Sequence, residues 1–124
     1  MPTIPENVKK AIEAQDYFAV ATSTADGVPN VAYVKYLKVI EGDKILIGDN
    51  YFAKTRENIL NNKKVAFAVL DEEKGSFQIK GTATRLTEGK WFDYVQTWVS
   101  EKLPRAAAVI VEVENIYNGA EIIC

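Results

Sequence analysis

Much of the chain alternates apolar and polar side chains with a period of two, which is typical of β-strands. The segment SFQIKGTATRL, residues 76–86, alternates cleanly. We predict that four of its residues point inward, Phe77, Ile79, Gly81 and Ala83, and four outward, Ser76, Gln78, Lys80 and Thr82. A glycine inside a strand, here Gly81, indicates a sharp bend or a close approach of another backbone segment.

Shorter apolar runs bounded by turn residues predict further strands at 17–23, 30–40, 44–48 and 64–71 and in the closing segment 105–119. Asp26-Gly27 is a typical hairpin turn, so we expect the first two of these strands to pair. The strand at 30–40 is apolar on both alternating faces, which predicts that it is covered on both sides. In the closing strand we expect the buried side to carry Ala107, Val109, Val111 and Val113.

Apolar positions spaced three or four residues apart predict three helices. The first covers about residues 5–15, with Pro5 at its first helical position. The second has its apolar stripe on Phe52, the stem of Arg56, Ile59 and Leu60. The third runs from about Gly89 to Lys102 and is rich in aromatic residues, so we expect it to reach a partner chain as well as the core.

About six strands in antiparallel hairpin order, with helices at the ends and corners, favour a mainly β fold. We expect a small closed or split β-barrel and not a doubly wound parallel sheet. The chain has 124 residues and is 48% apolar, which is enough for one small core. We therefore expect a single domain over residues 1–124.

Charge and hydropathy narrow the possible partners. The net charge is −2 and the basic residues form no cluster, so we expect no nucleic-acid binding. No apolar stretch approaches the roughly 20 residues that a membrane span needs. The first ten residues lack the apolar region of a signal peptide, so we expect a cytoplasmic protein.

The chain contains no histidine and a single cysteine, Cys124. An intrachain disulfide is therefore impossible, and we predict no metal site. The usual general base and the nucleophilic arrangements that depend on histidine are excluded too. If the protein is an enzyme, we expect a cofactor to carry the reaction, and the sequence indicates no catalytic residue.

A candidate for binding that cofactor lies in GDNYFAKTRENIL, residues 48–60, where a strand ends in a polar loop and a helix begins. Lys54 and Thr55 fall in the first turn of that helix. A helix N-terminus presents unpaired N–H groups and the positive end of its dipole, so an ammonium and a hydroxyl there predict a phosphate site. The alternative is a solvated helix that begins with Lys-Thr, since both residues are common on helix surfaces.

Four strings stand out in the order of the predicted elements: YFAVATSTADGVPNVAYVKYLKV, KILIGDNYFAKTRENI, SFQIKGTA and RAAAVIVEV. These strings and the order of elements resemble the FMN-binding split-barrel family around pyridoxamine 5′-phosphate oxidase, most closely its short FMN-binding protein type. The resemblance implies a six-stranded antiparallel Greek-key split β-barrel with two to three short helices. It also implies a homodimer with FMN near the subunit interface.

The resemblance further implies which residues contact FMN. Lys54 and Thr55 would hold the phosphate. The isoalloxazine and ribityl would contact the strand formed by Asn30, Val31, Ala32, Tyr33, Val34 and Lys35. The ring would be flanked by the loop residues Gly48, Asp49, Asn50 and Tyr51.

Two departures from the family limit the functional prediction. The C-terminal region is short and has no histidine, so vitamin B6 oxidation is not implied. Where the short FMN-binding type can cover the flavin with a tryptophan, this chain has Leu103-Pro104. We expect a flavin-dependent oxidoreductase or an electron carrier, with substrate and electron donor undefined. The alternatives are a non-catalytic flavin- or haem-related binding or storage protein and a deazaflavin-dependent reductase.

Overall fold

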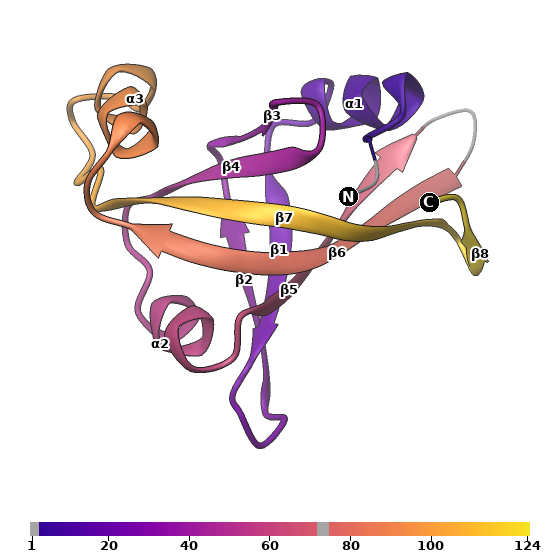
Figure 1. Ribbon diagram of the computed structural model, residues 1–124, viewed down its shortest axis with the longest axis horizontal. Helices are drawn as coiled ribbons and strands as arrows, with labels where there is room; N and C mark the ends of the chain where they lie inside the picture. The colour runs from indigo at the N-terminus through magenta and orange to yellow at the C-terminus, as the bar shows by residue number, and fades with distance from the viewer. Residues whose placement is uncertain (1–2, 72–74) are drawn as a thin grey trace.

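A computed structural model describes residues 3–71 and 75–124 of the chain, which form one strongly curled antiparallel sheet with helices at its margins (Figure 1). The helices of the described residues are α1 (Glu6–Glu13), α2 (Lys54–Asn61) and α3 (Lys90–Trp98). The strands are β1 (Phe18–Ser23), β2 (Pro29–Val34), β3 (Leu37–Ile40), β4 (Lys44–Asp49), β5 (Lys64–Asp71), β6 (Gly75–Leu86), β7 (Ala107–Asn118) and β8 (Glu121–Ile122). The fold is mainly β, as predicted.

The two edges of the sheet are consecutive strands of the chain. The strand order is β2-β1-β5-β6-β7-β4-β3, with β8 paired to β7, so β2 and β3 lie at opposite ends of that order. Only Lys35 and Tyr36 separate them in the sequence. The sheet therefore has to curl until its edges meet at this dipeptide, where the Gly48 N–H donates to the Tyr36 carbonyl at 2.9 Å. The result is the split barrel that the sequence predicts.

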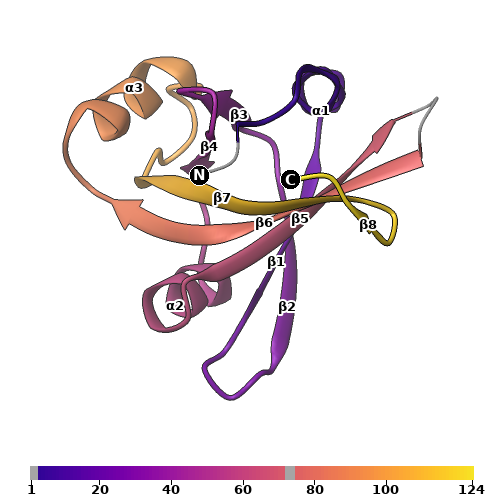
Figure 2. The same cartoon turned by 45° about the vertical axis from the view of Figure 1, so that its right-hand side comes forward.

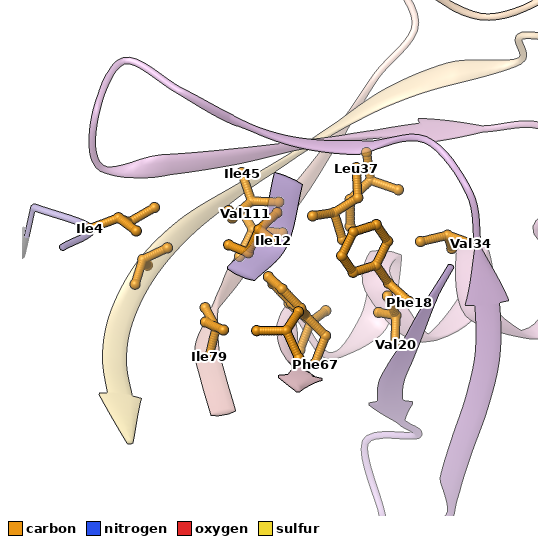
Figure 3. Packing of buried hydrophobic residues seen from close by; sticks show 14 of the residues in the cluster. Ile4, Ile12, Phe18, Val20, Val34, Leu37, Ile45, Phe67, Ile79 and Val111 are labelled. Atoms are coloured by element: carbon orange, nitrogen blue, oxygen red, sulfur yellow. The ribbon is translucent and has the colours of Figure 1, made fainter. Parts of the chain in front are cut away.

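The main core fills the inside of the curled sheet. Figure 3 shows side chains from α1 and from strands on both sides of the split converging on it, among them Ile12, Phe18 and Ile45. Phe18 and Phe67 pack edge to face with ring centroids 6.3 Å apart. Burial of these apolar side chains is the main source of stability for a domain of this size.

A second, smaller core lies on the outer face of β4 and β7, under α3. Leu46, Ala108 and Ile110 face away from the barrel interior and pack with Val95 and Val99. These two strands therefore bury both of their faces, which explains the nearly continuous apolar run in β7. The four residues predicted on the buried side of β7 are all buried, namely Ala107, Val109, Val111 and Val113.

The predicted alternation in β6 is confirmed. The inward set is buried, and the prediction of a close backbone approach at Gly81 is also confirmed. A Cβ at this position would lie 2.3 Å from the Glu112 carbonyl oxygen, and the pairing with β7 shifts register between Lys80 and Gly81. The hairpin of β1 and β2 around Asp26-Gly27 is confirmed as well, and it extends beside α2 (Figure 2).

The prediction of one strand over 30–40, covered on both sides, is wrong. The chain breaks into β2 and β3 at Lys35 and Tyr36. With this break and the short β8, the described residues form eight strands where six were predicted. One face of β2 is exposed, with 64% of Val31 and 78% of Tyr33 accessible. The apolar pattern could not distinguish a doubly covered strand from an edge strand with one exposed apolar face.

Helices α1 and α3 are shorter than predicted, and the buried face of α2 matches the predicted stripe only in part. Its buried residues are Thr55, Asn58 and Ile59, whereas Leu60 is exposed. The polar members of this face are hydrogen-bonded, since the Asn58 side-chain amide donates to the Thr22 hydroxyl at 3.0 Å. None of the described helices is long and apolar enough to cross a membrane.

Candidate cofactor-binding site

A cavity of about 470 Å³ opens where the barrel is split, beside the first turn of α2. Its size falls within the range of small-molecule and cofactor sites. Residues from both sides of the split line it: Tyr17, Asn30, Val31, Ala32, Tyr33, Val34, Lys35, Tyr36, Gly48, Asn50, Tyr51, Phe52, Ala53, Lys54, Thr55 and Leu103.

One wall of the cavity is the edge strand β2. Because β2 pairs with β1 alone in the described sheet, half of its backbone N–H and C=O groups point away from the ladder. Its side chains alternate between the barrel interior, where Val34 is buried, and the exposed face with Val31 and Tyr33. This wall therefore offers hydrogen-bonding backbone and flat apolar surface together.

A second wall of the cavity is the start of α2. Its N-cap is Ala53, whose side chain has no oxygen to accept from the N–H groups of the first turn. Thr55 is 3% exposed, and its hydroxyl oxygen accepts a hydrogen bond from the Asn30 side-chain amide at 3.1 Å. This bond ties β2 to α2 and leaves the single hydroxyl proton of Thr55 to donate elsewhere.

The Asp49 side chain holds the loop between β4 and α2 through hydrogen bonds. Its side chain is 1% exposed, and Oδ1 accepts from the Phe52 N–H at 3.0 Å. Oδ2 accepts from Nε of Arg85 at 2.9 Å. Both carboxylate oxygens are therefore engaged within the protein. The next residue, Asn50, accepts at its side-chain oxygen from the Arg105 N–H at 3.0 Å.

The structure brings the predicted site residues to one cavity with one exception. All of them except Asp49 line it. Sequence reasoning missed five lining residues, Tyr17, Tyr36, Phe52, Ala53 and Leu103. The hairpin register offered a signal for Tyr17, because Phe18 lies opposite Val34 and its neighbour must then lie near residue 35. Leu103 lies at the place where the short FMN-binding type can carry a tryptophan over the flavin.

The charge around the cavity is positive. Lys35 and Lys54 line it, and no carboxylate belongs to the described lining. Asp49 is a buried acid that lies between the lining residues Gly48 and Asn50 in the sequence, and its charge is paired with that of Arg85. A cavity with two ammonium groups, a helix N-terminus and no opposing carboxylate favours an anionic ligand.

Comparison with known proteins identifies the family. The sequence profile described as pyridoxamine 5′-phosphate oxidase matches residues 4–119, and the chain belongs to this family. The uncharacterized protein MJ0282 of Methanocaldococcus jannaschii is 36% identical over 120 residues, which cover 93% of this chain and 80% of that protein.

Solved structures agree with this assignment. HupZ of Group A Streptococcus superimposes with a TM-score of 0.85 at 28% identity, covering 98% of both chains. An FMN-binding protein of Syntrophomonas wolfei superimposes with a TM-score of 0.70 at 21% identity, over 90% of this chain and 82% of that one. An F420 reductase and HutZ, the haem storage protein of Vibrio cholerae, share the fold at 20% and 16% identity.

Proposed function

We propose that this protein binds FMN in the cavity at the barrel split and acts as a flavin-dependent oxidoreductase or electron carrier. The observation that carries the proposal is the meeting of Lys54 and Thr55 with the exposed edge of β2 in one cavity, whose described lining contains no carboxylate. One end of the cavity thus suits a phosphate and the other suits a planar ring.

At the phosphate end, each group has a donor to spare. The Lys54 ammonium supplies charge, and the Thr55 hydroxyl has its acceptor side occupied by Asn30 and its proton available. Charge-assisted hydrogen bonds of this kind are about twice as strong as neutral ones. The uncapped first turn of α2 adds N–H groups and the positive end of the helix dipole.

At the ring end, the backbone of β2 would pair with the polar edge of the isoalloxazine, while Tyr36, Tyr51 and Leu103 supply apolar contact area. When bound, FMN supplies the electron or hydride transfer, and the protein supplies binding, orientation and exclusion of water. Lys35 would place a positive charge beside the ring and favour its reduced, anionic form.

We further propose that a second copy of the chain covers the exposed side of this cavity. Val31, Tyr33 and Tyr51 are 64%, 78% and 74% exposed, and all three line the cavity. Apolar and aromatic surface gathered in this way is typical of an interface. The expected assembly is a cytoplasmic homodimer with each FMN near the subunit interface.

The first experiment is the absorption spectrum of the purified protein, followed by calorimetric titration with FMN and riboflavin. We expect flavin bands, or tight uptake of FMN by the apoprotein, and binding of riboflavin about tenfold weaker or worse because it lacks the phosphate. Bands of a deazaflavin would move the assignment to that cofactor. No binding of FMN would refute the proposal.

A haem ligand is the second candidate. The observation in its favour is the presence of Tyr17, Tyr33 and Tyr51 at the cavity, since tyrosine is one of the axial ligands of haem iron. The absence of histidine from the sequence counts against it. Titration with ferric haem tests it: a Soret shift in the wild type that disappears in Tyr33→Phe or Tyr51→Phe would favour haem over FMN.

A further inference from the structure

A second cavity, of about 670 Å³, lies between the turn of the β1–β2 hairpin and the outer side of α2. The residues that line it are Thr24, Val28, Pro29, Asn30, Ala53, Lys54, Arg56, Glu57 and Asn58. Nothing in the family comparison or in the proposed binding of FMN requires this space.

The two cavities adjoin at the proposed phosphate site. Asn30, Ala53 and Lys54 line both of them. A phosphate held at Lys54 would therefore lie at the boundary, with the flavin extending into the first cavity. Any group attached to the far side of that phosphate would extend into the second.

The lining of the second cavity has three kinds of surface. Arg56 adds a guanidinium to the shared ammonium of Lys54, and Glu57 adds a carboxylate. Val28, which is 57% exposed, and Pro29 form a small apolar surface on the hairpin side. A cation pair, a carboxylate and an apolar surface match the phosphate, the ribose hydroxyls and the base of a nucleotide, in that order.

Arg56 is available for such a contact. Its one ion pair among the described residues is with the adjacent Glu57, at 3.8 Å, and both side chains are largely accessible, 46% and 63%. Pairs of this kind between exposed side chains contribute about 0–1 kcal/mol, so Arg56 loses little by turning toward a phosphate. Glu57 would then be free to accept from ribose hydroxyls.

We propose that the second cavity takes the adenylate half of a flavin dinucleotide, so that the protein binds FAD as well as FMN. The isoalloxazine and ribityl occupy the first cavity, the pyrophosphate lies against Lys54 and Arg56, and the adenosine lies over Val28 and Pro29. This inference rests on the proposed function, because it uses the same flavin site and extends it beyond the phosphate.

The test is calorimetric titration of the apoprotein with FMN and with FAD, in the wild type and in Arg56→Ala. We expect FAD to bind the wild type at least as tightly as FMN. Arg56→Ala should weaken FAD about tenfold and change FMN less than about twofold, because a charge-assisted contact to the second phosphate is lost. Arg56→Lys keeps the charge and loses the planar guanidinium, so its affinity for FAD should lie between those of the wild type and of Arg56→Ala.

Lys63→Ala is the matched control, since Lys63 is an exposed cation just after α2 that lines neither cavity. It should leave both affinities unchanged, and circular dichroism of each variant verifies folding. Weaker binding of FAD than of FMN to the wild type, or equal loss of both ligands in Arg56→Ala, would overturn the second-cavity assignment alone. If neither flavin binds, the proposed function itself fails.

Discussion

Arg85 in β6 donates from Nε to Oδ2 of Asp49 at the end of β4, at 2.9 Å, with Arg85 14% and Asp49 1% exposed. Strand β7 lies between β6 and β4, so this buried ion pair spans a strand. The other oxygen of Asp49 receives the Phe52 N–H at 3.0 Å. One carboxylate therefore fixes the loop that carries Asn50 to Ala53 along the cavity.

Replacing Asp49 should destabilise the protein strongly. Asp49→Ala leaves the Arg85 guanidinium and the Phe52 N–H without their acceptor, and removal of one partner of a buried pair costs about 3–5 kcal/mol. Urea unfolding measures this loss. Glu114→Ala removes the exposed pair with Lys64 and should cost less than about 1 kcal/mol. Equal losses in the free energy of unfolding would show that the buried pair stabilises the protein no more than the exposed pair does.

Replacing Lys54 should weaken FMN binding without affecting the fold. Lys54 is exposed, and its side chain has no hydrogen-bonding partner among the described residues, so Lys54→Ala should leave the free energy of unfolding nearly unchanged. Loss of a charge-assisted bond to phosphate should raise the dissociation constant of FMN about tenfold to a hundredfold. Riboflavin should bind the wild type and the variant about equally. An unchanged constant for FMN would remove Lys54 from the site.

Gly81→Ala should distort the β6–β7 pairing. The added Cβ would lie 2.3 Å from the Glu112 carbonyl oxygen and 2.7 Å from Cγ1 of Val111, so backbone has to move. Overpacking of this kind costs about 1–3 kcal/mol. Gln78→Ala, at an exposed position of the same strand, is the control and should change stability little. A variant of Gly81 as stable as this control would mean that the strands separate there at no cost.

The proposed dimer predicts that association and flavin binding are linked. Tyr33→Glu introduces a charge at a 78% exposed position beside the cavity and should both dissociate the dimer and release FMN. Leu70→Glu alters an equally exposed apolar residue, 76% accessible, that does not line the cavity, and should do neither. Analytical ultracentrifugation with and without FMN measures both effects. A monomeric wild type that retains FMN tightly would contradict a shared pocket.

The hairpin turn should contribute a small acid-dependent stabilisation. A hydrogen bond from the Thr24 hydroxyl, together with one from backbone, lowers the pKa of the Asp26 carboxyl below its ordinary value of 3.8. A folded pKa below the unfolded one stabilises the protein above pH 3.8, and this stabilisation is lost as the pH falls through the folded value. The difference in stability between wild type and Asp26→Asn should therefore shrink from about pH 7 to about pH 3. A difference independent of pH would contradict the shift.

The strands of the sheet were predictable where a single periodic signal dominates. In β6 the alternation alone separates inward from outward residues, and Gly81 marks the close approach. The apolar residues of the segment 30–40 fit two different structures, a strand covered on both sides and an edge strand with an exposed apolar face. Apolar residues at Val31 and Tyr33 are typical of a covered strand, yet both positions are exposed, because β2 is an edge strand and no other element of the described chain packs on this face.

The sequence predicted where the candidate site lies, but it did not predict all the contacts that hold the site together. Lys54 and Thr55 were identified by their position at a helix start, which is a local property. The partner of Asp49 is 36 residues away, and nothing local indicates that this carboxylate would be buried beneath the loop. Leu60 was misassigned for a related reason, since the buried face of α2 is set by polar partners such as Thr22.

The two-residue link between β2 and β3 determines how wide the mouth of the cavity is. Lys35 and Tyr36 join the two margins of one sheet, and the bond from the Gly48 N–H to the Tyr36 carbonyl continues the β3–β4 pairing into this link. A larger ligand cannot be admitted by trimming lining side chains alone, because the barrel would also have to uncurl around this link. Insertion of one or two residues there would enlarge the aperture while leaving every lining side chain in place. In this chain, connection length is therefore a route to a bulkier ligand that is separate from side-chain exchange.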